Sequence, residues 1–224
     1  MNIYINGTGC VSPQHTAQGG PLLGTLKEYE QVRLAVVDPD YKQWIDLKQI
    51  RRMSRIVKMG VAAANLSLEA AGITMPDAII TGTAYGCLDD TGVFLTKMVN
   101  QQEEMLTPTA FIQSTHNTVA GQIALLLQCH GYNNTFVHRG FSFENALTDA
   151  SMILEEGSAA NILVGGMDEI TNHSQQIISR FGIYKKAPVK TMELLNSHDS
   201  GTIAGEGAAF LALGKEKGPG CTSV

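Results

Sequence analysis

The sequence predicts an α/β fold in which helices are layered against a buried sheet. Five short segments have the composition of strands, and four of them meet a glycine within two residues of their end. Three longer segments between the strands repeat apolar residues at helical spacing. Strands that alternate with helices are typical of layered α/β domains, and apolar strands are typical of a covered sheet. We therefore expect the glycine turns to lie at one edge of the sheet and to carry function.

The five expected strands share one pattern, in which a short apolar run meets glycine. In chain order they cover Asn2–Asn6 before Gly7, Ala78–Thr81 before Gly82, Asn134–His138 before Gly140, Asn161–Val164 before Gly165, and Gly207–Leu213.

The three expected helices cover Ser54–Ala71, Thr118–Cys129 and Ser142–Glu156. The first has a face of small residues, so it can approach a neighbouring element closely, and Gly72 can cap its C-terminus. The third begins directly after a strand and a glycine, and it ends at Gly157. The last residues, GPGCTSV, have no periodicity and predict a tail.

The composition is that of an ordinary globular protein, with 224 residues, 44% of them apolar, and a net charge of -5. A negative net charge gives no reason to expect nucleic acid or an anionic membrane as a partner. No segment approaches the roughly 20 apolar residues that span a membrane, and the start of the chain lacks the regions of a signal peptide. We expect a cytoplasmic protein.

The four cysteines, Cys10, Cys87, Cys129 and Cys221, are scattered without CxxC spacing. This pattern predicts free thiols in a reducing compartment rather than disulfides or a zinc site. We expect neither a metal nor a cofactor held by this chain.

The stretch FVHRGFSFENAL, Phe136 to Leu147, is typical of a strand that turns sharply into a helix. Its Gly140-Phe141-Ser142-Phe143-Glu144 begins like the Gly-x-Ser-x-Gly elbow of serine hydrolases, but Glu144 replaces the second glycine. A hydrolase would also need His173 or His198 as its base. The alternative is that Ser142 caps the helix through its side-chain oxygen.

Five segments, in order, resemble the N-terminal half of the β-ketoacyl synthase family, which has the thiolase fold. They are INGTGCVSP, IRRMSRIVKMGVAAANLSLEAAGI, TPTAFIQSTHNTVAGQIALLL, AANILVGGMDEIT and DSGTIAGEGAAFLAL. The resemblance implies a five-stranded mixed sheet with helices on both faces. It places the synthase-like domain at residues 1–214 and a Gly/Pro-containing tail at 215–224. In the family, a second similar half supplies two histidines and an oxyanion-hole loop, and we expect that half to be absent here.

Condensing members of the family carry Thr-Ala-Cys-Ser-Ser where the third strand meets its helix, because a helix N-terminus lowers the pKa of the cysteine thiol. Matching Val137 to the family valine places Phe141 at the cysteine position and Ser142 on the following serine. A phenyl ring cannot form a thioester. The resemblance therefore implies a chain-length-factor-like subunit without catalytic residues, with Phe141 at the vestigial nucleophile position. The stretch from His138 to Glu144 resembles the branch found in aryl-polyene and flexirubin-type clusters.

Such a subunit implies a cysteine-bearing ketoacyl synthase as its partner, in a homo- or heterodimer, and an acyl carrier protein whose phosphopantetheine arrives only through that partner. The third strand and neighbouring helices would form the main contact. The competing hypotheses are an active synthase or other acyltransferase with a relocated nucleophile, for which Cys87 is the candidate, and a serine hydrolase that uses Ser142.

Individual site residues leave alternatives open. Phe141 either plugs the vestigial acyl site or fills the core. Arg139 pairs with Glu144, binds the carrier's phosphopantetheine or lies at a subunit contact. His138 is expected at a core or interface position. Gly140 supplies the sharp turn. Gly205-Glu206-Gly207 is expected to serve the backbone geometry, with Glu206 hydrogen-bonded to a neighbouring turn.

Overall fold

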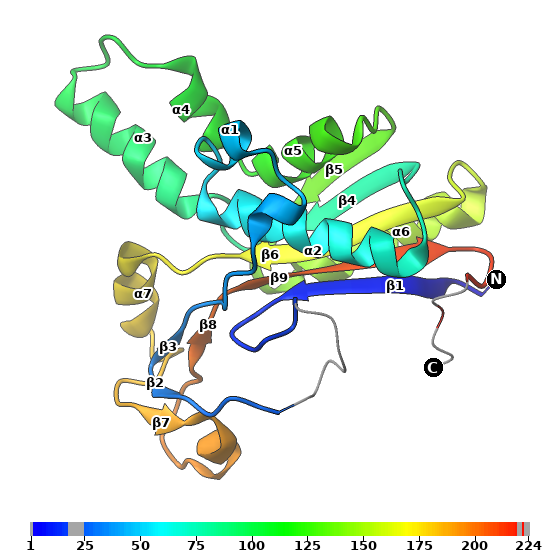
Figure 1. The fold of residues 1–224 in the computed structure, drawn as a ribbon. Coiled ribbons are helices and arrows are strands. Elements are labelled where there is room, and N and C mark those ends of the chain that lie inside the picture. The colour runs from blue at the N-terminus through cyan, green and yellow to red at the C-terminus, as the bar shows by residue number, and fades with distance from the viewer. Residues whose placement is uncertain (1, 18–24, 219–220, 222–224) are drawn as a thin grey trace.

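The computed structural model describes residues 2–17, 25–218 and 221. A five-stranded sheet runs through the molecule with helices on both of its faces, as Figure 1 shows. The strands are β1 (Tyr4–Val11), β4 (Ala78–Gly82), β5 (Tyr132–Phe136), β6 (Asn161–Asp168) and β9 (Gly207–Gly214). Their spatial order is β1-β9-β6-β4-β5, in which β4 is parallel to β5 and β6, and β9 is antiparallel to β6 and β1. The expected mixed sheet is therefore confirmed.

The prediction of a turn is wrong at two positions, because the glycines there lie inside strands. Gly7 falls within β1, and Gly165 within β6. A Cβ atom at Gly7 would overlap the backbone of Ser67 on the neighbouring helix, and one at Gly165 would overlap the ring of Phe210. These glycines therefore permit close packing across the sheet rather than turns. The third strand also lies earlier than expected, ending at Phe136 instead of His138.

The three expected helices are confirmed with small changes of boundary. They are α2 (Arg55–Ala71), α5 (Thr118–Leu127) and α6 (Ser142–Glu156). Helix α2 ends at Gly72 and α6 at Gly157, with φ values of 68° and 82°. Both lie in the left-handed region, which glycine adopts without a steric penalty.

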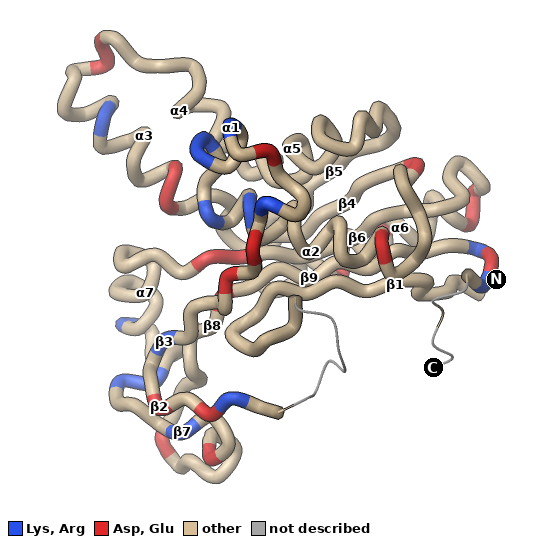
Figure 2. Tube along the Cα trace, in the orientation of Figure 1, with Lys and Arg blue, Asp and Glu red and all other residues tan. Residues whose placement is uncertain are grey.

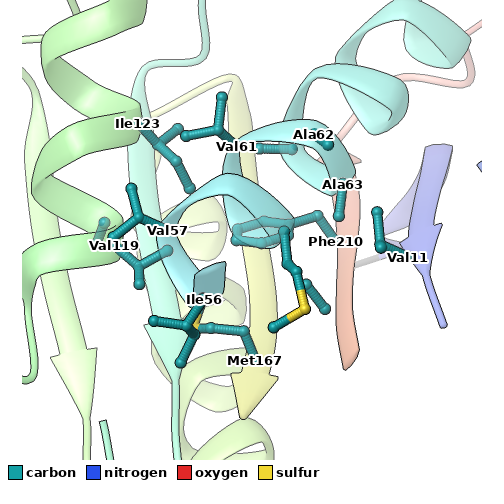
Figure 3. Close-up of a cluster of buried hydrophobic side chains, with 14 of the residues drawn as sticks. Val11, Ile56, Val57, Val61, Ala62, Ala63, Val119, Ile123, Met167 and Phe210 are labelled. Carbon is teal, nitrogen blue, oxygen red and sulfur yellow. The ribbon is translucent and has the colours of Figure 1, made fainter. Parts of the chain in front are cut away.

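Helices α2 and α5 cover one face of the sheet and α6 covers the other (Figure 1). Figure 3 shows the larger core, where Ile56, Val57 and Val61 of α2 lie over Phe210 and Met167 of the strands and beside α5. Phe210 is fully buried. The small residues of α2 let it lie close to β1, as their pattern predicts.

Several elements lack a strong apolar pattern and were not expected. They are β2 (Glu30–Gln31), β3 (Arg33–Leu34), η1 (Tyr41–Gln43), α1 (Leu47–Ile50), α3 (Leu88–Asn100), α4 (Pro108–Gln113), η2 (Arg139–Phe141), α7 (Asn172–Ser179), β7 (Val189–Lys190), η3 (Thr191–Asn196) and β8 (Ala204–Gly205). Helices α3 and α4 form an arm that projects from the sheet (Figure 1), joined by an edge-to-face contact of Phe94 and Phe111 with ring centroids 5.7 Å apart. Helix α3 has no buried residue.

The expected tail begins where β9 ends. Asn6 accepts a hydrogen bond from the Gly218 backbone N–H at 2.8 Å and donates one to the Glu216 carbonyl at 3.0 Å, so the start of the tail is tied to β1. Residues 219–220 and 222–224 of the expected tail lie outside the described residues. Within the part of the chain that the structure describes, no helix is both long and apolar enough to cross a membrane.

Candidate functional site

The candidate site lies at the sheet edge where three parallel strands end. β4 ends at Gly82, β5 at Phe136 and β6 at Asp168. Because β4 is parallel to both neighbours, these three ends lie side by side. The turn η2 follows β5 and leads directly into α6. The strand–turn–helix geometry expected for FVHRGFSFENAL is therefore present.

Ser142 fastens this turn to the neighbouring strand. It is 3% exposed, and its hydroxyl lies 2.8 Å from the carbonyl oxygens of Thr83 and Arg139, either of which can accept its proton. The same oxygen accepts a hydrogen bond from the backbone N–H of His138 at 2.8 Å. Ser142 is the first residue of α6, and the capping position before it belongs to Phe141. The expectation that Ser142 caps the helix is thus wrong, because its hydroxyl binds the preceding turn and the end of β4.

These bonds also bear on Ser142 as a nucleophile. A serine nucleophile needs a base that hydrogen-bonds its hydroxyl and a path to substrate. The Ser142 hydroxyl is buried and is bonded to backbone groups. Among the described residues, no histidine side chain is hydrogen-bonded to it. The geometry therefore favours a structural role.

Phe141 projects from the same turn into solvent. Its side chain is 73% exposed, so the expectation that it fills the core is wrong. It occupies the N-cap position of α6, where the positive end of the helix dipole would act on a side-chain nucleophile. Its ring offers no such group.

Arg139 does not pair with Glu144, which corrects that expectation. Its guanidinium carbon lies 6.0 Å from the centre of the Tyr85 ring, at the distance of a cation–π contact. Glu144 lies in the first turn of α6, where the helix dipole already stabilises a carboxylate. The positive φ at this turn, 54°, belongs to Arg139. The expectation that Gly140 supplies the sharp turn is wrong, because Gly140 is not among the residues with positive φ and a Cβ atom there would meet nothing within 4 Å.

His138 is exposed, so a core position is wrong for this residue. Its ring lies 6.2 Å from that of Phe136, centroid to centroid. Its backbone N–H, rather than its imidazole, binds Ser142. A role at a subunit interface stays a prediction.

Asp168 holds the turn that follows β4, a role that the sequence did not reveal. Its carboxylate accepts hydrogen bonds from the hydroxyl of Thr83 at 2.9 Å and from the backbone N–H groups of Ala84 and Tyr85 at 2.9–3.2 Å. Burial raises the pKa of Asp168, and these donors oppose the rise. The turns after β4 and β6 are thus connected through one side chain.

Glu169 connects the same edge to the projecting arm. Its carboxylate accepts a hydrogen bond at 3.0 Å from the backbone N–H of Asp89, in the first turn of α3. The side chain is buried, and burial, together with the charges of Asp89, Asp90 and Glu206, raises the pKa of Glu169 to about 7. Figure 2 shows acidic segments close together where β6 ends and β9 begins.

The side chain of Glu206 hydrogen-bonds neighbouring segments, as expected, although Val36 and Ile170 lie in irregular segments rather than in turns. It accepts from the backbone N–H groups of Val36 and Ile170, both at 3.2 Å, and it forms an ion pair with Arg55 of α2. Its side chain is 0% exposed. Three segments distant in sequence therefore meet on one carboxylate.

Residues 28–217 match the sequence pattern of the family described as "Beta-ketoacyl synthase, N-terminal domain". This chain belongs to the β-ketoacyl synthase family. A curated relative, 3-oxoacyl-[acyl-carrier-protein] synthase 2 of Synechocystis sp., is 22% identical over 94% of this chain. The chain spans 57% of the length of that relative.

Two solved structures show the same fold. One is described as the ishigamide ketosynthase/chain length factor and has a TM-score of 0.75 at 21% identity. The alignment covers 95% of this chain and 58% of the chain in that structure. The other is a ketosynthase, ApeO, in complex with its chain length factor, ApeC, from Xenorhabdus doucetiae. It has a TM-score of 0.66 at 16% identity, and the alignment covers 97% of this chain and 81% of the chain in that structure. These likenesses confirm the thiolase-like fold of this β-ketoacyl synthase chain.

Cys87 is the candidate for a relocated nucleophile in this β-ketoacyl synthase chain. It is 1% exposed and follows the turn after β4. Burial, with smaller effects of Asp90 and Glu169, raises the pKa of its thiol to about 12. A nucleophilic cysteine needs the opposite environment, because the thiolate is the reactive form. Cys129 is also buried and donates to the Pro76 carbonyl at 3.2 Å.

We expect iodoacetamide at pH 8 to alkylate Cys87 at least about 1,000-fold more slowly than an unperturbed thiol, since its pKa of about 12 leaves correspondingly little thiolate. Peptide mass spectrometry over a time course measures the rate. In urea, Cys87 should be alkylated like an ordinary thiol. Fast alkylation of Cys87 in the folded protein would support the relocated nucleophile.

No group of three or more His, Cys, Asp or Glu side chains that could hold a metal ion occurs among the described residues. The sequence interpretation found the turn at Ser142 but missed Asp168, Glu169 and Tyr85. The available signal was the pair of acidic residues directly after a buried strand, which parallel topology brings to the same edge as the Ser142 turn.

Proposed function

We propose that this chain is a chain-length-factor-like subunit without catalytic activity of its own, which acts in fatty-acid-like or polyene biosynthesis beside an active synthase. The observation that carries the proposal is Phe141, an exposed phenyl ring on the turn where condensing members of the family hold their cysteine. The buried, bonded hydroxyl of Ser142 and the raised pKa of Cys87 leave neither as a ready substitute.

The surface around the turn supports a partnership. β5 is an edge strand of the sheet, with β4 as its neighbour on one side, and an edge strand offers unpaired backbone groups to another strand. Beyond it, Val137 is 37% and Phe141 is 73% exposed. The arm adds further exposed apolar side chains, including Val99 at 73% and Phe111 at 57%. Exposed apolar area of this kind is typical of a surface that a partner covers.

In this proposal the partner is a cysteine-bearing ketoacyl synthase, and the acyl carrier protein delivers its phosphopantetheine-bound chain to that partner. Two structural neighbours are described as containing a chain length factor, which supports this arrangement. The stretch from His138 to Glu144 supports a polyene product, since it resembles the aryl-polyene branch. Phe141 would then close the vestigial acyl site.

The test is transfer of an acyl group from an acyl-carrier-protein thioester in the presence of a cysteine-bearing synthase from a neighbouring reading frame. We expect the two chains to co-purify and the acyl group to appear on the synthase alone, as measured by intact-protein mass spectrometry. A Phe141→Cys variant is the matched control, because it places a thiol at a helix N-terminus, and it should become alkylated by iodoacetamide at residue 141.

Three results would contradict the proposal. An acyl adduct on the unmodified chain would show that it carries a nucleophile. Labelling of Ser142 by a fluorophosphonate would support the serine hydrolase instead. Condensation catalysed by this chain alone would exclude a role without catalysis.

A further inference from the structure

A cavity lies in the segment between α7 and β9. Its volume is about 370 Å³. It is bounded by one stretch before β7 and another after η3 (Figure 1). We call it the Lys185 cavity, and its lining includes Tyr184, Lys185, Lys186, Ala187, Ser197, Asp199 and Ser200.

Lys185 is the unusual member of this lining, because it is only 6% exposed. Its ammonium group donates a hydrogen bond to the hydroxyl of Ser197 at 2.7 Å and another to the backbone carbonyl of Asp199. Both acceptors are uncharged. A lysine ammonium has three N–H donors, and within residues 2–17, 25–218 and 221 the third has no hydrogen-bond acceptor.

The charge of Lys185 is also uncompensated. The two ion pairs found among the described residues both involve Arg55, so no described carboxylate lies within 4.0 Å of the Lys185 ammonium. A buried charge without a partner of opposite sign is costly, and proteins ordinarily pair such charges. An anion in the cavity would offset that cost and accept the third N–H.

The lining holds two lysines against one acidic residue, Asp199, so its formal charge is positive. Lys186 adds a second positive charge, and Tyr184, Ser197 and Ser200 add hydroxyl groups that can donate hydrogen bonds. Figure 2 shows both basic and acidic segments beside β7. A single inorganic ion would leave most of the volume empty, whereas cavities of roughly 300–1,000 Å³ hold small organic molecules.

The segment that carries Lys185 is held in place before any ligand binds. The backbone N–H of Lys185 donates to the Thr202 carbonyl, and that of Thr202 donates to the Ile183 carbonyl, both at 2.9 Å. Tyr184 and Thr202 form an isolated parallel bridge. A site fixed in this way loses little conformational entropy on binding.

We propose that the Lys185 cavity binds a small molecule with a phosphate or carboxylate group, whose oxyanion bonds directly to the Lys185 ammonium. The cavity shares no lining residue with the Ser142 turn, although Tyr184 lies within electrostatic range of Tyr85 and Asp168. The proposed binding does not depend on the proposed synthase partnership. Lys186 and the hydroxyl groups of the lining would orient the remainder of the ligand.

Inorganic phosphate and succinate serve as separate probes, each titrated at an ionic strength held constant with sodium chloride. We expect saturable binding of at least one, measured by isothermal titration calorimetry. At ten times its Kd, that probe should raise Tm by roughly 3 to 6 °C. The probe that binds more tightly identifies the oxyanion.

Three variants separate a binding site from a structural lysine. Lys185→Met removes the charge of the ammonium group. Ala187→Leu places a larger side chain at an exposed residue of the lining, which narrows the cavity and leaves both hydrogen bonds of the Lys185 ammonium intact. Each should weaken binding at least 10-fold. Lys190→Met is the matched control, since Lys190 is exposed and does not line the cavity, and it should bind as the unmodified chain does.

The absence of saturable binding of either probe would overturn the proposal. Unchanged binding in Ala187→Leu would do the same, and this result remains informative even if Lys185→Met fails to fold. An equal loss of binding in Lys190→Met would show that net charge rather than the cavity attracts the anion.

Discussion

Replacement of Glu206 by alanine is expected to lower the free energy of unfolding by about 3–5 kcal/mol. The side chain of Glu206 is 0% exposed and accepts two backbone N–H groups in addition to its ion pair with Arg55. Its removal leaves the N–H groups of Val36 and Ile170 buried without acceptors, and each such group costs about 1–3 kcal/mol. The Arg55 charge loses its buried partner and keeps only the pair with Asp38 at 3.9 Å, although Arg55 is 35% exposed and therefore partly solvated.

Urea denaturation of the purified chain measures this loss. Glu193→Ala is the matched control, because Glu193 is an exposed glutamate in η3, and it should change the free energy of unfolding by less than about 0.5 kcal/mol. Glu206→Gln keeps an acceptor for one N–H, so its effect should be smaller than that of alanine. A loss below about 1 kcal/mol for Glu206→Ala would show that water replaces the carboxylate at this position.

A double variant tests whether the charge or the hydrogen bonds dominate. In Arg55→Met combined with Glu206→Ala, both members of the buried ion pair are removed, whereas the two N–H groups still lack their acceptor. Asp38, which also pairs with Arg55 at 3.9 Å, is 52% exposed and stays solvated. If the charge dominates, the double variant should be more stable than Glu206→Ala. If the hydrogen bonds dominate, its stability should be equal or lower.

The order and type of the main elements could be predicted because each carries its own local signal. Helix α2 has a small-residue face and a glycine at its end, and β4 is a short apolar run before Gly82. Helix α3 has no comparable signal, since it buries no residue and projects from the sheet. Its position depends on Glu169, which binds Asp89 of α3 and follows that residue by 80 positions in the chain.

The glycines show why local signals can mislead. Gly7 and Gly165 look like turns because glycine is common there, but each lies in a strand against a backbone or ring from a distant segment. The absence of a Cβ atom allows both a turn and close packing inside a strand. The sequence around the glycine therefore does not distinguish a turn from a packed strand. The residue that packs against the glycine, such as Phe210 against Gly165, is known only once the strands are paired.

Ser142 shows the same limitation at the candidate site. A serine between a strand and a helix is an ordinary N-cap, whereas here its hydroxyl binds the Thr83 carbonyl, which precedes it by 59 residues. The position of Phe141 on the turn could be predicted from the order of family segments. Its exposure could not, because exposure depends on the path of the chain through η2.

Glu169→Gln is expected to make the chain more stable than the unmodified protein at pH 8, by up to about 3 kcal/mol, and to leave stability nearly unchanged near pH 4.5. Burial raises the pKa of Glu169 from 4.5 to about 7. The folded state therefore holds this proton more tightly than the unfolded chain does. The resulting stabilisation is fully present below about pH 4.5 and is lost as pH rises through about 7.

Glutamine does not titrate, yet its amide oxygen can still accept the Asp89 N–H that Glu169 accepts at 3.0 Å. Between pH 4.5 and 7, the free energy of unfolding should therefore fall less steeply in Glu169→Gln. Some pH dependence should remain, because burial also raises the pKa values of Asp90 and Asp168 in the same direction. Urea denaturation at a series of pH values measures both slopes.

Glu155→Gln is the matched control, since Glu155 is an exposed glutamate near the end of α6 and its replacement changes net charge by the same amount. Its slope should equal that of the unmodified chain. Parallel slopes for Glu169→Gln and the unmodified chain would mean that Glu169 titrates at its ordinary pKa, and that water reaches the carboxylate at the base of α3. A steeper slope in Glu169→Gln would mean that the carboxylate's bond to Asp89 outweighs its burial.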